Sequence, residues 1–271
     1  MARLFAGFVN KINAQHPVTR TGDTRYRQQV YPGLSAEMFA GGHFVRRTLF
    51  PYAENENFLA ILLWRPVMTR IYPPSVVAKF GGTSVADFDA MNRSASIVLA
   101  DQDVRLVVLS ASAGVTNLLV ELSEGLETHQ QLDKLETLRA IQYNIISRLK
   151  QPSVICTEID NLLNNIQRLA QTAMVSPSDA LSDELVSHGE LMSSLLFTEV
   201  LRERQAEAEW FDARCVMRTN ANFGCAEPEL GTLHHQVETH LRPRLEQAIM
   251  VTQGFIGRDA AGHTTTLGRG G

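Results

Sequence analysis

The most constraining feature of this sequence is a buried-strand pattern that runs into paired glycines and then into a helix. Val76 to Phe80 is apolar apart from Lys79, Gly81 and Gly82 follow at once, and amphipathic spacing then continues to about Ala100. A strand, a glycine turn and a helix make the first half of a βαβ unit. A chain built this way must supply further strands that lie parallel to the first.

The rest of the chain supplies them. Val104 to Leu109 is β-branched and apolar enough to lie buried on both faces of a parallel sheet. We expect the helix at 183–204 to begin at Ser182 as N-cap, with Asp183 and Glu184 in its first turn. Further strands are predicted at 208–211 and 248–255, and further helices near 117–126, 131–150, 156–174 and 229–246. This alternation predicts an α/β fold, a mainly parallel sheet with helices on both faces.

Composition excludes several classes of protein. The 271 residues are 44% hydrophobic and 20% charged, as in soluble globular chains. The longest apolar run, Phe58 to Trp64, is far shorter than the roughly 18 residues of a membrane span, and the N-terminus lacks a signal-peptide pattern. Three widely spaced cysteines, Cys156, Cys215 and Cys225, favour neither a disulfide framework nor a metal site. We expect a cytoplasmic protein without a nucleic-acid or membrane partner.

Residues 1–75 differ from the remainder in composition. They carry nine Lys/Arg against four acids, a balance of +5, so the remainder carries −9. They also hold 11 of the 19 aromatic residues and six of the ten prolines, without sustained periodicity. The basic residues are scattered singly, which argues against a nucleic-acid-binding or membrane-binding arm. We expect a poorly ordered extension, or residues upstream of the true start of the gene.

In parallel sheets, ligands bind at the carboxyl ends of the strands, and the first strand ends at a candidate phosphate site. Glycine lets a backbone approach a phosphate closely, the following helix N-terminus offers N–H groups, and Lys79 adds a positive charge beside Gly81 and Gly82. The lysine precedes the glycines, so this is not a Walker A loop. Taken alone, the pattern is explained more often by a tight turn with a solvated lysine than by a phosphate site.

Two more loops and one helix carry candidate residues. Ser110 to Asn117 supplies hydroxyl and N–H groups after the second strand, although any polar turn could look the same. Arg269, among glycines in Thr264 to Gly271, suits a carboxylate or phosphate clamp, and a flexible basic tail is the alternative. In the helix, Gly189 indicates a close approach by another group. Beside it, Glu190 could meet an ammonium group, whereas His188 fits a structural hydrogen bond better than a catalytic one.

These stretches together resemble the aspartokinases of the amino acid kinase superfamily. Lys79 to Val85, Ser110 to Asn117, His188 to Glu190 and Thr264 to Gly271 match the family motifs in order and at family spacing. The resemblance is continuous over 76–271 and is strongest to the monofunctional, lysine-sensitive aspartokinase III group of enteric bacteria. It implies the amino acid kinase fold, a three-layer αβα arrangement, of which the chain carries the N-terminal lobe only.

The resemblance also implies an activity and a site. Family members transfer the γ-phosphoryl group of MgATP to the β-carboxylate of L-aspartate, the first step of lysine, threonine and methionine biosynthesis. Lys79 would stabilise the transferring phosphoryl group, and the aspartate carboxylate is already ionised, so no general base is needed. The implied contacts to ATP phosphates are Lys79, Phe80, Gly81, Gly82 and Ser110. Thr116, Glu190 and Arg269 would hold aspartate, with Glu190 on its ammonium group, and no residue is implied as a metal ligand.

The chain departs from the family pattern at both ends. The extension at 1–75 has no counterpart, and the family continues beyond Gly271 into a nucleotide-binding lobe and two ACT domains, on which family oligomerisation and lysine inhibition depend. We therefore expect 76–271 to be the amino-acid-binding part of the kinase domain and the chain as written to be inactive. Alternatives are a non-catalytic remnant, part of a bifunctional aspartokinase–homoserine dehydrogenase, or another kinase of the superfamily, such as glutamate 5-kinase.

Overall fold

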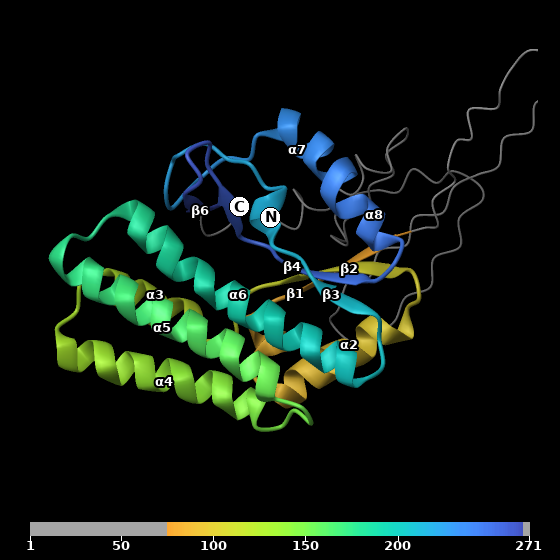
Figure 1. Cartoon of the computed structure of the whole chain (residues 1–271), viewed down its shortest axis with the longest axis horizontal. Coiled ribbons are helices and arrows are strands. Elements are labelled where there is room, and N and C mark those ends of the chain that lie inside the picture. Colours follow the sequence, from red (N-terminus) through yellow and green to blue (C-terminus); the bar gives the residue numbers. More distant parts are fainter. Residues whose placement is uncertain (1–74, 268–271) are drawn as a thin grey trace, which may run out of the picture.

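Four parallel strands form the centre of the computed structural model, which describes residues 75–267 (Figure 1). The strands are β1 (Val76–Phe80), β2 (Val104–Leu109), β3 (Ala208–Trp210) and β4 (Ile249–Gln253), in the order β1-β2-β4-β3. Phe80 pairs with Leu109, and Leu109 pairs with Gln253. The carboxyl ends of β1, β2 and β4 are therefore level, and the residues that follow them share one edge of the sheet.

Helices cover both faces of this sheet (Figure 1). One face carries α2 (Phe88–Ala100), α3 (Val115–Ser123), α4 (Thr128–Ile146), α5 (Ser153–Val175) and α6 (Asp179–Glu203). The other carries α7 (Leu230–Gln236), a π-helical turn (Val237–Leu241) and α8 (Arg242–Leu245). Parallel crossovers are right-handed, so the connections that run outward to β3 and the one that returns to β4 lie on opposite faces. The predicted three-layer αβα fold is confirmed.

Strand β2 shows why both faces are buried. Val107 and Leu109 belong to the core beneath α2 to α6, whereas Leu106 and Val108 belong to the core beneath α7 and α8. Successive side chains of a strand point to opposite faces, so an unbroken apolar run can fill two cores at once.

A small hairpin lies beyond the main sheet. β5 (Ile256–Arg258) pairs antiparallel with β6 (Thr264–Thr266). Asp183 of α6 holds this hairpin in place: it accepts hydrogen bonds from Thr266 N at 2.8 Å, from Thr266 Oγ1 at 2.7 Å and from Gly224 N at 2.9 and 3.0 Å. Thr264 to Thr266, expected to be a binding loop, are instead buried in this pairing.

Three predicted boundaries were wrong. α6 begins at Asp179, because Ser178 rather than Ser182 caps it by accepting from Leu181 N at 3.2 Å. The glycine turn leads first into a 3₁₀ turn, Gly82–Val85, and α2 starts only after the N-cap Asp87. The helix predicted at 229–246 is broken into α7, the π-helical turn and α8, which has a proline in its first turn.

Part of the prediction lies outside the described residues. This holds for the extension up to Pro74 and for Gly268 to Gly271, which includes Arg269. Among the described helices, none is long and apolar enough to cross a membrane.

Candidate functional site

Lys79 and Glu190 meet at the carboxyl edge of the sheet. Lys79 is exposed at the end of β1, and its Cε lies 3.7 Å from the position that a Cβ on Gly254 would occupy. Gly254 follows β4 directly, and its backbone N–H donates to Glu190 Oε2 at 2.9 Å. The side chains of Lys79 and Glu190, which are far apart in the sequence, therefore both lie beside Gly254.

Glu190 is held by the backbone rather than by a charged partner. Its Oε2 accepts from the N–H groups of Gly254 and Phe255, both at 2.9 Å, and within residues 75–267 its Oε1 accepts no hydrogen bond. Burial raises the pKa of Glu190 to about 8, although the two N–H donors and the positive charge of Lys79 oppose this. The site thus contains a fixed carboxyl group whose Oε1 makes no hydrogen bond within residues 75–267, and a nearby ammonium group would favour its ionised form.

The glycine turn has two roles, one for each glycine. A Cβ on Gly82 would lie 2.7 Å from the carbonyl oxygen of Ala111, and the Gly82 carbonyl accepts from Ala113 N at 3.1 Å. This glycine therefore packs the first turn against the loop that follows β2. Gly81 is exposed and has open space where a Cβ would stand, so of the two it is the one that could face a phosphate.

Phe80 and Ser110 lie between these features. Phe80 is 4% exposed, and its ring centroid is 6.1 Å from that of Phe197, so its side chain belongs to the core. Any contact of Phe80 with a phosphate would have to use its backbone. Ser110 N donates to the Phe80 carbonyl at 3.2 Å, and the Ser110 carbonyl accepts from Ser193 Oγ of α6 at 2.9 Å.

The loop after β2 leads into the N-terminus of α3. Gly114, at a φ of 83°, precedes the helix without a side-chain cap, and Thr116 is half-buried in its first turn. α6 packs tightly here, since a Cβ on Gly189 would lie 2.8 Å from Ala111 Cβ and 3.3 Å from Val115 Cγ1. Thr116, next to Val115, therefore lies in the region where α3 packs against the turn of α6 that carries Gly189 and Glu190.

His188 is a structural residue. It is 1% exposed, its Nδ1 is 2.7 Å from the Glu184 carbonyl, and its Nε2 is 2.9 Å from Asn165 Nδ2. A carbonyl only accepts and an amide nitrogen only donates, so Nδ1 carries the proton and Nε2 accepts. Burial lowers the pKa of His188, which favours the same neutral form.

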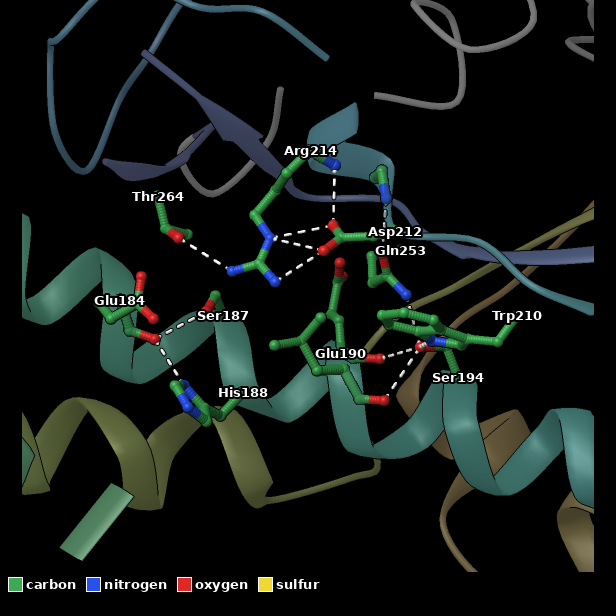
Figure 2. A network of polar contacts seen from close by, with 12 residues as sticks. Glu184, Ser187, His188, Glu190, Ser194, Trp210, Asp212, Arg214, Gln253 and Thr264 are labelled. Atoms are coloured by element: carbon green, nitrogen blue, oxygen red, sulfur yellow. Dashed lines mark hydrogen bonds and ion pairs between the residues drawn. The ribbon is translucent and has the colours of Figure 1, made fainter. Parts of the chain in front are cut away.

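A network behind Glu190 has no counterpart in the sequence-based prediction (Figure 2). Ser194 Oγ accepts from Gln253 Nε2 at 2.7 Å and from Trp210 Nε1 at 2.8 Å, and it donates to the Glu190 carbonyl at 2.6 Å. Gln253 Oε1 accepts from Ala213 N at 2.9 Å. Polar residues spaced this widely leave no local pattern in the sequence. The only local sign of this part of the site is Gly254, a glycine that follows an apolar strand directly.

The ion pair of Arg214 and Asp212 borders the network. Arg214 binds Asp212 through two nitrogens and donates from NH1 to Thr264 Oγ1 at 3.0 Å (Figure 2). These bonds join the segment after β3 to the start of β6 and compensate the charge of the guanidinium group. Arg214 therefore stabilises the hairpin rather than offering a free cation to a ligand.

The chemistry open to this site is the binding of a zwitterion beside an anion. Glu190 offers a carboxylate for an ammonium group, while Lys79 and the exposed Gly81 turn offer positive charge and N–H groups for a phosphate. Within residues 75–267, no group of three or more His, Cys, Asp or Glu side chains could hold a metal ion.

Comparison with known proteins identifies the family. A model of the amino acid kinase family matches residues 74–271, and the chain belongs to that family. Lysine-sensitive aspartokinase 3 of Escherichia coli is 62% identical over 196 residues, which are 72% of this chain and 44% of that protein. The predicted resemblance to the aspartokinases is confirmed.

Two further comparisons extend this result. The crystal structure of E. coli aspartokinase III with aspartate and ADP matches with a TM-score of 0.71 over 72% of this chain and 44% of that one. Bifunctional aspartokinase/homoserine dehydrogenase 2 of E. coli is 32% identical over 200 residues, 71% of this chain and 24% of that protein. The chain thus spans less than half the length of these relatives, and its identity to the monofunctional enzyme is about twice that to the bifunctional one.

Proposed function

We propose that this chain contributes the amino-acid-binding part of an aspartate kinase, which transfers the γ-phosphoryl group of ATP to the β-carboxylate of L-aspartate. The meeting of Lys79, Gly254 and Glu190 at the end of the sheet carries this proposal. It places a carboxylate suited to an ammonium group next to a cation suited to a phosphoryl group. The high identity to a lysine-sensitive aspartokinase supports the same assignment.

On the substrate side, Glu190 Oε1 binds the ammonium group of aspartate. Thr116 at the start of α3 and Arg269, which lies outside the described residues, bind its carboxylates. An acid on one side and hydroxyl and guanidinium donors on the other match an amino acid that carries two carboxylates. The β-carboxylate is ionised at neutral pH and attacks without a general base.

On the nucleotide side, Lys79 neutralises charge that develops on the transferring phosphoryl group. The exposed turn at Gly81 and the backbone of Phe80 and Ser110 border the phosphates, while Gly82 packs this turn against Ala111. Phosphoryl transfer depends mainly on positioning and charge neutralisation, which these groups can supply. Mg²⁺ would arrive with ATP.

Further assignments belong to the same proposal. Residues 76–271 form the amino-acid-binding part of the catalytic domain, and the enzyme works in the cytoplasm, as biosynthetic enzymes of this family do. Its subunits associate as homo-oligomers through ACT regions of the kind that follow the kinase domain in the family.

The direct test is phosphoryl transfer by a polypeptide extended to the length of the E. coli relative. With MgATP and L-aspartate, hydroxylamine should trap the acyl phosphate as aspartyl hydroxamate. L-Glutamate should give none, which separates this activity from that of a glutamate kinase. Equal product with glutamate, or product with neither amino acid, would contradict the proposed function.

A further inference from the structure

We propose that Ser194, together with Gln253, positions the Glu190 carboxylate for recognition of the substrate ammonium group. This inference rests on the proposed function, because it concerns how the same site distinguishes an amino acid. Neither residue touches the ligand in this account, so both are positioning residues.

The Ser194 hydroxyl is saturated with hydrogen bonds. A hydroxyl can donate one hydrogen bond and accept two. Ser194 Oγ accepts from Gln253 and Trp210 and donates to the carbonyl of Glu190 one helical turn earlier, with distances of 2.6 to 2.8 Å. Ser194 and Gln253 are both 0% exposed, so water cannot replace a bond that is lost.

The network also joins α6 to the end of β4. Ser194 lies on α6, four residues beyond Glu190, whereas Gln253 is the last residue of β4 and immediately precedes Gly254. The bond between Gln253 and Ser194 therefore ties the turn of α6 that carries Glu190 to the end of β4. The N–H group that follows this strand end donates to the Glu190 carboxylate. Figure 2 shows the Glu190 side chain leaving α6 in the direction of Gln253.

The network also affects the position of Glu190 Oε1, the oxygen that the protein leaves without a hydrogen bond in residues 75–267. Glu190 Oε2 is fixed by two backbone donors on the β4 side, so the place of Oε1 depends on the separation of β4 and α6. The bond between Gln253 Nε2 and Ser194 sets that separation, and the bond from Ala213 N to Gln253 Oε1 fixes the orientation of the Gln253 amide. Loss of the hydroxyl should displace the carboxylate without removing its charge.

A double-mutant cycle tests this. Ser194→Ala is combined with Glu190→Gln, and the affinity of the 271-residue chain for L-aspartate is measured by equilibrium dialysis. If Ser194 acts through the Glu190 charge, Ser194→Ala should weaken binding about tenfold in the parent and less than about twofold in the Glu190→Gln protein. A purely structural effect would cost the same in both backgrounds.

Thr198→Val is the matched control. Thr198 is 1% exposed on the same helix and donates to the Ser194 carbonyl at 2.7 Å, but it makes no bond to β4. It should leave the aspartate affinity within about twofold of the parent. Should Ser194→Ala fail to fold, Gln253→Met takes its place in the cycle, since it keeps the length of the side chain but can neither accept from Ala213 nor donate to Ser194.

The outcomes separate the two proposals. Equal losses in both backgrounds, or no loss on Ser194→Ala, would overturn the positioning role and leave the proposed function standing. A parent chain that does not bind aspartate, or a Glu190→Gln protein that binds it as well as the parent, would overturn the assignment of Glu190 to the ammonium group and the positioning role with it.

Discussion

Gly82 packs against the carbonyl of Ala111 so closely that a Cβ on the glycine would lie 2.7 Å from that oxygen. Two loops that follow neighbouring strands are joined here by backbone alone, without side chains between them. The position of Lys79 relative to the loop after β2 depends on this contact.

The first prediction is that Gly82→Ala destabilises the protein by about 1–3 kcal/mol, because the added methyl group must push one backbone segment from another. Gly81→Ala is the control, since its φ of −81° is ordinary and a Cβ there meets nothing within 4 Å. Its free energy of unfolding in urea should stay within about 0.5 kcal/mol of the parent. Equal stability of both variants would contradict the packing role of Gly82.

The same Gly81→Ala variant tests phosphate binding. If a phosphate approaches this exposed turn, the methyl group should raise the KM for ATP in the extended enzyme while the KM for aspartate changes little. An unchanged KM for ATP would remove Gly81 from the phosphate site.

Lys79→Ala should reduce kcat by about 10²-fold or more in the extended enzyme, with a smaller change in the KM for aspartate. This is expected if the Lys79 ammonium group acts mainly in the transition state. Because Lys79 is exposed, thermal unfolding should change little. Lys79→Arg, which retains the charge, should recover part of the loss. A Lys79→Ala enzyme that keeps more than about half of the parent kcat would exclude the proposed role.

Glu190 should make the stability of the unliganded protein depend on pH. Its pKa is about 8 in the folded state against 4.5 for an ordinary glutamate, so between these values the folded state holds a proton that the unfolded state has lost. Stability from this group is therefore present below about pH 5 and is lost as pH rises toward 8, by up to about 1.4 kcal/mol per pH unit.

Urea unfolding of the parent and of Glu190→Gln from pH 5 to 8 measures this contribution. The substituted protein cannot titrate at this position, so its stability should fall less over the same interval. Parallel curves for the two proteins would show that Glu190 is already ionised at pH 5.

Asp183→Asn should destabilise the protein by about 2–4 kcal/mol, since an amide cannot accept all the bonds that the carboxylate receives from Gly224 and Thr266. Asp179→Asn is the control: this residue is exposed in the first turn of the same helix and should cost no more than about 1 kcal/mol. Denaturant unfolding of both compares a buried carboxylate with an exposed one. Similar losses would show that Asp183 does not hold the hairpin.

The sequence predicts the strands of the main sheet because their apolar runs serve two cores at once. It misplaces the start of α6 because Ser178 and Ser182 both precede acidic residues, and local pattern cannot decide which serine caps the helix. The β5–β6 hairpin is missed since its three-residue strands are specified mainly by partners elsewhere, notably Asp183.

The residues of the candidate site also differ in how far the sequence reveals them. The sequence singles out Lys79 and Glu190 because a lysine before paired glycines and an acid beside a helical glycine are unusual locally, and the structure brings both side chains next to Gly254. The network of Ser194 and Gln253 was not found, because the two residues are 59 positions apart and each looks ordinary in its own segment.

The strand order has a consequence for how the protein is made. β4 lies between β2 and β3, so during synthesis β2 and β3 emerge from the ribosome before the strand that separates them. The interval between the ends of β2 and β4 lasts on the order of ten seconds at ordinary rates of translation. Throughout it, the apolar edge Leu106–Leu109 has a neighbour on one side only, which makes the nascent chain a candidate for chaperone binding until Ile249–Gln253 closes the sheet.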